Sequence, residues 1–203
     1  MPSFANPPPA TEGLRWMLFV DGENFAARGQ ATCQLQGRAF EAGGRWRRDI
    51  FLWMQRPAKE RVVQVAATLP LQAYATRASY YTSVVGSDED VRNTEEALWA
   101  LGFTPFVFKK KKDGRSKGVD ITLTKDLLTH AFHGHYDAAV LATGDADYTP
   151  AVSEVRRMGK QVHLMAFSSG LGDALRLACD SLTNLDPFLH LFPLAKETEP
   201  SAK

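Results

Sequence analysis

Short apolar runs alternate with helical patterns along most of the chain. Compact apolar segments with the length of buried strands lie at 16–20, 71–83, 104–110, 136–144 and 161–167. Apolar residues recur at helical spacing over 87–102, 119–134, 147–160 and 168–180. Strands that alternate with helices predict an α/β protein with a mostly parallel central sheet and helices on both faces. Near-continuous apolar strands agree, because parallel strands are buried on both sides.

The ends of the predicted helices carry recognisable signals. Ser87 or Asp88 can cap the helix over 87–102, acids fill its first turns, and Gly102 ends it. The region 24–61 is less regular, and its pattern predicts a helix, a loop and a second helix.

Composition narrows the class of protein. A chain of 203 residues with 44% hydrophobic and 23% charged residues is an ordinary globular protein, and one domain is expected. We assign this domain to 13–194, with a Pro-rich disordered lead-in at 1–12 and a polar disordered tail at 195–203. The net charge of +1 gives no overall attraction to nucleic acid or membrane, so any basic surface must be local.

Cysteine use and hydropathy indicate the compartment. The two cysteines, Cys33 and Cys179, stand far apart and in no metal-ligand spacing, which argues against a disulfide scaffold. We find neither a signal peptide nor an apolar run long enough for a membrane helix. The sequence therefore predicts a cytoplasmic protein without a membrane partner.

Acidic residues follow several predicted strands. Asp21 and Asn24 come after the strand at 16–20. Asp120 lies in the first turn of the helix that follows the strand at 104–110 and the basic residues after it. Asp145 and Asp147 follow the strand at 136–144. Ligands collect at the carboxyl ends of the strands in open parallel sheets. We therefore expect four carboxylates from three segments to gather at one edge.

Carboxylates this close repel one another unless a cation neutralises them. Oxygen ligands suit Mg²⁺ or Mn²⁺, and the absence of His and Cys from the predicted cluster disfavours zinc. An acidic metal site beside a basic tract points to a phosphodiester substrate and to a metal-activated water as the nucleophile. Each acid also has a structural interpretation, since Asp favours turns, helix caps and first helical turns.

Three motifs carry a resemblance to a known family. FVDGEN (19–24), SKGVDITLTKDLL (116–128) and LATGDADYTPAV (141–152) resemble, in order and approximate spacing, the NYN domain of the LabA/DUF88 type. That group of PIN-like proteins includes metal-dependent ribonucleases. The resemblance covers roughly residues 15–186 and implies a PIN-like three-layer sandwich that cleaves RNA with Mg²⁺ or Mn²⁺. Family members often have Ser in place of Thr143 and Phe in place of Tyr148.

The resemblance also implies roles for individual residues. Asp21, Asp120 and Asp145 form the acidic core, and Asp147 and Asn24 support it. The metal ligands would be Asp21, Asp120, Asp145 and Asp147.

Basic and hydroxyl side chains near the same edge are expected to contact RNA. This substrate-binding set consists of Thr143, Ser168, Lys109, Lys110, Lys111, Lys112, Arg115 and Lys117. A second patch, Arg45–Arg48, combines cations with Trp46 and could stack a base.

Several nearby residues are expected to lie outside the site. We expect Glu23 to be exposed and Asp126 to be solvated, because Asp126 lies about 240° round the helix from Asp120. Core packing is favoured for at least one of Tyr80 and Tyr81. The histidines of HAFHGH (130–135) are expected at the far edge of the sheet from the acids.

Other functions fit the sequence less well. DADYT matches the nucleophile motif of haloacid-dehalogenase phosphatases, but that motif normally opens its domain, and here only about a quarter of the chain follows it. A Toprim-like site would need a Glu after an earlier strand, and Glu23 is a poor substitute. The rival from another class is a non-catalytic RNA-binding or regulatory NYN module. The sequence leaves open a homo-oligomer or a regulatory protein partner.

Overall fold

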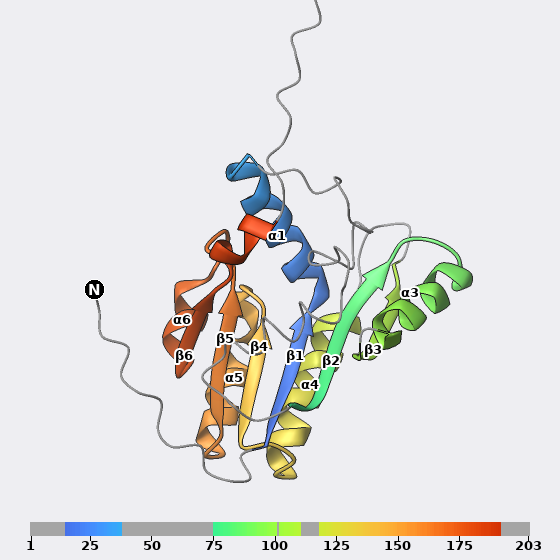
Figure 1. Cartoon of the computed structure of the whole chain (residues 1–203). Coiled ribbons are helices and arrows are strands. Elements are labelled where there is room, and N and C mark those ends of the chain that lie inside the picture. The colour runs from blue at the N-terminus through green and yellow to red at the C-terminus, as the bar shows by residue number, and fades with distance from the viewer. Residues whose placement is uncertain (1–14, 38–74, 101, 111–117, 192–203) are drawn as a thin grey trace, which may run out of the picture.

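A computed structural model describes residues 15–37, 75–100, 102–110 and 118–191. These residues form a six-stranded sheet in which every strand pairing is parallel. Its strands are β1 (Trp16–Asp21), β2 (Ala75–Val84), β3 (Thr104–Lys109), β4 (Ala138–Ala142), β5 (Gln161–Ala166) and β6 (Ser181–Asn184). The order is β3-β2-β1-β4-β5-β6, so β1 and β4 are neighbours at the centre (Figure 1). The strand order reverses between β1 and β4. This position is the topological switch point, where open parallel sheets bind ligands.

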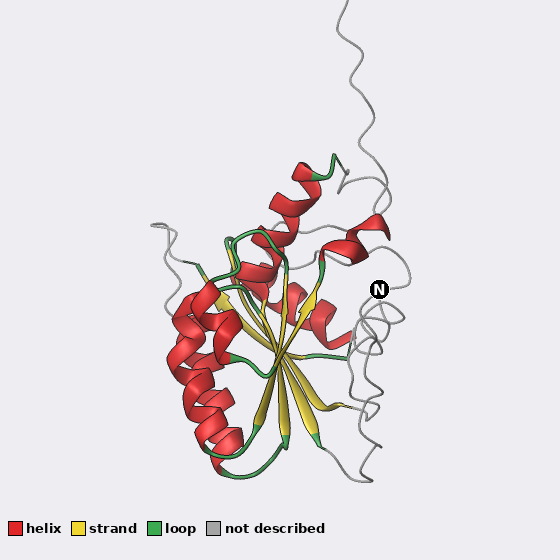
Figure 2. Ribbon diagram, turned by 90° about the vertical axis from the view of Figure 1, so that its left-hand side faces the viewer, coloured by secondary structure: helices red, strands yellow, loops and turns green. Residues whose placement is uncertain are grey.

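Helices cover both faces of this sheet and give three layers (Figure 2). The described α-helices are α1 (Gly22–Leu35), α3 (Asp88–Ala100), α4 (Gly118–Phe132), α5 (Thr149–Arg157) and α6 (Asp173–Ala178). Two 3₁₀-helices, η1 (Ala146–Tyr148) and η2 (Asp186–Leu191), complete the described elements. The predicted α/β sandwich with helices on both faces is confirmed.

Alternation along the strands divides the interior into two cores. Trp16, Leu18 and Val20 of β1 face α1 and α3, whereas Met17 and Phe19 face α4, α5 and α6. Both sets are buried, as the near-continuous apolar sequence of a parallel strand requires. The strand ends are therefore held rigidly from both sides.

The C-terminal part differs from the sequence-based prediction. The helix predicted over 168–180 is wrong in extent, because α6 begins only at Asp173. Gly170 has a φ of 76°, and Gly172 is the residue before the helix, so the chain forms a loop there. The strand β6 was not predicted at all. It has four residues with one apolar side chain, Leu182, which is itself 39% exposed.

Smaller differences concern boundaries. The helix predicted over 147–160 is divided into η1 and α5, and the strand predicted over 136–144 is confined to Ala138–Ala142. Ser87 caps α3, since its hydroxyl accepts from the Asp90 N–H at 3.2 Å while the Asp90 carboxylate accepts from the Ser87 N–H at 2.7 Å.

Some predictions fall on residues outside the described part. They concern the lead-in at 1–12, the tail at 195–203, the second helix before residue 61 and the Arg45–Arg48 patch. Within the described residues, every helix is too short or too polar to cross a bilayer.

The two faces of α4 provide a test of the core. Leu123 is fully buried, whereas Ile121 of the same helix is 67% exposed. We expect Leu123→Ala to lower the free energy of unfolding by about 2–5 kcal/mol, because it removes packed methyl groups and leaves a cavity. Ile121→Ala should change it by only about 0.5 kcal/mol. Urea unfolding of both variants measures the difference, and equal losses would contradict this assignment of the core.

Candidate active site

A buried carboxylate at the end of the central strand forms the base of the site. Asp21 is the last residue of β1 and only 2% exposed. It caps α1, and its Oδ1 accepts from the Asn24 N–H at 3.1 Å. The next residue, Gly22, has no room for a side chain, because a Cβ there would overlap the Tyr80 ring and lie 2.9 Å from the Tyr81 carbonyl oxygen. The Asp-Gly pair is thus required by packing as well as by the cap.

Two side chains join Asp21 to the loop after β4. The buried Thr143 hydroxyl donates to Asp21 Oδ2 at 3.0 Å and accepts from the Asp145 N–H at 3.2 Å. Asn24 Oδ1 accepts from the Gly144 N–H at 2.9 Å. Asp21, at the end of β1, and Asp145, in the loop after β4, are therefore both held by one hydroxyl.

The pKa of Asp21 is raised from 3.8 to about 6. Burial is the main cause, the hydrogen bonds from Asn24 and Thr143 lower the pKa in part, and the charges of Asp120 and Asp145 raise it further. Repulsion between these acids shows that their carboxylates are near enough to interact.

Asp120 enters the site from the first turn of α4. The Tyr148 hydroxyl donates to its Oδ1 at 3.2 Å. Partial desolvation raises the pKa of Asp120, the Tyr148 hydrogen bond lowers it, and Asp145 and Asp147 raise it. Tyr148 is itself buried, and burial together with Asp21, Asp120 and Asp145 raises the pKa of its phenol. Sequence reasoning did not place Tyr148 in this cluster, although its position directly after Asp145 and Asp147 was a signal.

Asp145 and Asp147 combine a structural task with a place in the cluster. Asp145 caps η1, since its Oδ1 accepts from the Asp147 N–H at 3.0 Å. Asp145 is half-buried and Asp147 is exposed. The predicted capping role is therefore present for Asp145, and it leaves the carboxylate beside Asp21 and Asp120.

These acids fit a hard cation by donor chemistry, but they do not form a ready-made cage. Among the described residues, no three His, Cys, Asp or Glu side chains already stand in an arrangement that could hold a metal ion. Mg²⁺ typically uses only one or two carboxylates and completes its shell with water and substrate oxygens. The carboxylates of Asp120 and Asp145, which act electrostatically on Asp21, provide only oxygen ligands and suit that mode of binding.

The two described lysines of the basic tract are engaged in ion pairs. Lys109 Nζ lies 2.7 Å from Asp88 Oδ1, and Lys110 Nζ lies 3.6 Å from Glu23 Oε1. Glu23 also accepts from the Ser83 hydroxyl and is only half-exposed, so the expectation that it is exposed was wrong. The remaining members, Lys111, Lys112, Arg115 and Lys117, lie outside the described residues.

Ser168 stands at the end of β5 but is held by the chain itself. Its N–H donates to Asp186 Oδ1 at 2.9 Å, and its hydroxyl donates to Asp186 Oδ2. The loop that follows packs against the loop after β4: the Gly172 N–H donates to the Gly144 carbonyl at 3.0 Å, and a Cβ on Gly144 would lie 3.0 Å from the Gly170 carbonyl oxygen.

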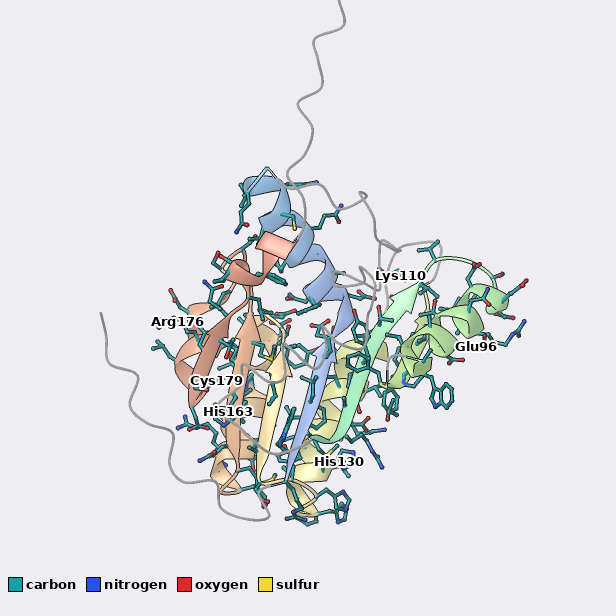
Figure 3. All side chains as sticks on the ribbon, in the orientation of Figure 1. Glu96, Lys110, His130, His163, Arg176 and Cys179 are labelled. Atoms are coloured by element: carbon teal, nitrogen blue, oxygen red, sulfur yellow. The ribbon has the colours of Figure 1, made fainter. Side chains whose placement is uncertain are left out.

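Asp126, the two adjacent tyrosines and the histidines lie outside the acidic cluster. Asp126 is not solvated as expected, because its carboxylate accepts from the buried Tyr81 hydroxyl at 3.1 Å. Tyr80 and Tyr81 are both buried, which confirms core packing. His130 lies at the opposite end of the sheet from Lys110 (Figure 3), where its Nδ1 is 2.8 Å from His135 Nδ1.

A three-layer sandwich with a parallel sheet and acids at its switch point defines a PIN-like α/β protein. The family model of the NYN domain matches residues 15–186, and the chain belongs to this family, which is part of the PIN-like nuclease superfamily. That superfamily generally uses divalent metal ions.

One solved structure of the same fold comes from Vibrio parahaemolyticus and is described as a protein of unknown function. It is 18% identical to this chain, with a TM-score of 0.57, and the match covers 85% of this chain and 93% of that one. At this identity the similarity shows the fold alone. A comparison with curated proteins gives no match.

The raised pKa of Asp21 predicts that the free energy of unfolding depends on pH. As the pH rises from about 4 to about 6, Asp21 ionises in the unfolded chain but keeps its proton in the folded one. Stability should therefore fall across this window, by up to about 3 kcal/mol for a pKa raised from 3.8 to about 6. Asp21→Asn removes this loss. Urea unfolding in EDTA should show the free energy of unfolding of Asp21→Asn rising relative to that of the wild type up to about pH 6. A difference between the two that does not change with pH would refute the assignment.

Proposed function

We propose that this protein is a metal-dependent ribonuclease that hydrolyses RNA phosphodiester bonds at the carboxyl edge of its sheet. The observation that supports this best is the convergence of Asp21, Asp120 and Asp145 at the switch point between β1 and β4. Burial is the main cause of the raised pKa of Asp21, and the charges of Asp120 and Asp145 raise it further. A divalent cation would favour the ionised form of all three carboxylates.

Asp21, Asp120 and Asp145 would hold the ion, with Asp147 assisting from the rim. When bound, Mg²⁺ or Mn²⁺ would activate a water and shield the charge that develops on phosphorus. Ionised carboxylates are required for this, so the site should work above the pKa of Asp21, which is about 6 without metal.

Neutral groups would position these acids. Asn24 fixes the loop through the Gly144 N–H, and Thr143 orients Asp21 and Asp145. The buried hydroxyl of Thr143 already makes two hydrogen bonds, so we assign it a positioning role in place of the predicted contact with substrate. Tyr148 orients Asp120 in the same way.

The basic tract would contact the RNA backbone. Lys109 and Lys110 are at the correct edge, and their ion pairs are partly exposed and therefore weak enough to exchange for phosphate. Lys111, Lys112, Arg115, Lys117 and Ser168 remain proposed contacts. We also propose the LabA/DUF88 subtype, on the three motifs that resemble it.

Cleavage of a labelled single-stranded RNA tests the proposal. With Mn²⁺ or Mg²⁺ the wild type should cut, and EDTA should abolish cutting. Asp145→Asn should lower the rate by about a hundredfold or more, because loss of a metal-holding carboxylate exceeds the effect of losing an outer-shell partner. Glu154→Gln serves as the matched control and should retain full activity, because Glu154 lies on α5 and pairs with Arg157 at 3.1 Å.

The outcomes separate the two classes of function. Full metal-dependent cutting by a folded Asp145→Asn protein would refute the proposed site. RNA binding without cutting under any metal would favour the non-catalytic RNA-binding or regulatory NYN module, in which the acids serve the fold.

Metal binding can be measured independently of cleavage. At about pH 8, Mn²⁺ should stabilise the wild type by about 2.7 kcal/mol when present at a hundred times its Kd, because it binds only the folded chain. The Asp21→Asn and Asp145→Asn variants should gain much less. Thermal unfolding against Mn²⁺ concentration gives the result, and equal gains in all three proteins would contradict a metal site at these acids.

A further inference from the structure

Arg28 of α1 stands at the rim of this site without an assigned role. It follows Asn24 by four residues, and residues four apart lie on the same face of a helix. Asn24 binds the Gly144 N–H at 2.9 Å, so this face of α1 is directed at the loop that carries Asp145. Arg28 is exposed one turn further along.

The guanidinium of Arg28 packs on the backbone of Gly170, in the loop between β5 and α6. A Cβ on Gly170 would overlap Arg28 Cζ and Nε and lie 2.5 Å from Nη1. Gly170 also has a φ of 76°, which residues with side chains rarely adopt. Because the Gly170 carbonyl is itself close to Gly144, Arg28 is positioned beside the acid-bearing loop.

This cation has no partner in the part of the chain that the structure describes. Its guanidinium makes no hydrogen bond and no ion pair there, although its carbonyl accepts from the Thr32 hydroxyl at 2.9 Å. Arg15, Arg156, Arg157 and Arg176 all have carboxylate partners within 3.2 Å. Arg28 is thus held in place by packing while its hydrogen-bond donors are left for a ligand.

We propose that Arg28 binds a phosphate of the RNA backbone at the rim of the acidic site. The substrate class rests on the proposed ribonuclease function. A guanidinium matches phosphate oxygens in a two-bond geometry. Its positive charge also offsets the repulsion between the carboxylates and the phosphates of any RNA that approaches the strand ends.

Binding of a fluorescein-labelled oligouridylate in EDTA, followed by anisotropy across KCl concentrations, tests this without cleavage. Arg28→Ala should raise Kd roughly tenfold, because a charged hydrogen-bonding group is lost. The slope of log K against log salt should become less steep by about 0.7, the value for one phosphate contact on a single strand. Arg28→Lys should keep the slope and recover part of the affinity.

The control is Arg157→Ala, at the far end of α5, where the arginine pairs with Glu154. It should change neither Kd nor slope. An Arg28→Ala protein that binds within twofold of the wild type with the same slope would overturn the proposal, as would a wild type that does not bind RNA.

Cleavage by the same variants separates this proposal from the nuclease function. If RNA binding depends on Arg28 but no divalent ion supports cleavage, the nuclease proposal is wrong and the phosphate contact is supported. If Arg28→Ala cleaves RNA with metal and an unchanged KM, the phosphate contact is wrong and the nuclease proposal is supported. If both hold, Arg28→Ala should raise KM more than it lowers kcat, since a rim contact acts on binding.

Discussion

The burial of one carboxylate at the end of the central strand is the constraint on which the site depends. Asp21 is removed from water, and the Asn24 N–H and the Thr143 hydroxyl compensate only part of that cost, as its raised pKa shows. Thr143 simultaneously holds the Asp145 N–H, so the hydroxyl that stabilises the buried charge also brings a second acid toward it. The site is an arrangement that folding alone leaves electrostatically unsatisfied, and a divalent cation is the simplest group that would satisfy it.

Sheet topology explains why these groups meet. In the order β3-β2-β1-β4-β5-β6 the chain leaves β1 toward one edge and returns at β4, so the loops that follow these two strands diverge to opposite faces. Asp21 and Asp145 border the space between those loops, and α4 brings Asp120 to it. Apolar cores pack against both faces of the central strands, and the acids lie at or directly after elements packed in this way, which suits a site of defined geometry.

The sequence predicts the central elements well because their patterns are local. Buried strands and amphipathic helices repeat at distinct periods, and the acids stand directly after them. The failures have a common physical cause. Glu23 and Asp126 are shielded by Ser83 and Tyr81, which lie 60 and 45 residues away along the chain, and no local pattern records such partners. The strand β6 is defined by its pairing with β5, and its own four residues contain only one apolar side chain, too few for a strand pattern.

The distance along the chain between the two halves of the site has a consequence for how the protein is made. Asp21 and Thr143 are separated by 122 residues, and β1 lies between two strands that are both synthesised after it. Contacts of such long range form late, because the loop that joins them must be closed first. During synthesis Asp21 therefore leaves the ribosome well before the residues that will hold it. A nascent chain that ends before β4 lacks Thr143 and Asp145 and therefore cannot contain the assembled acidic centre. Whatever chemistry the centre performs is confined to chains whose synthesis has passed this point.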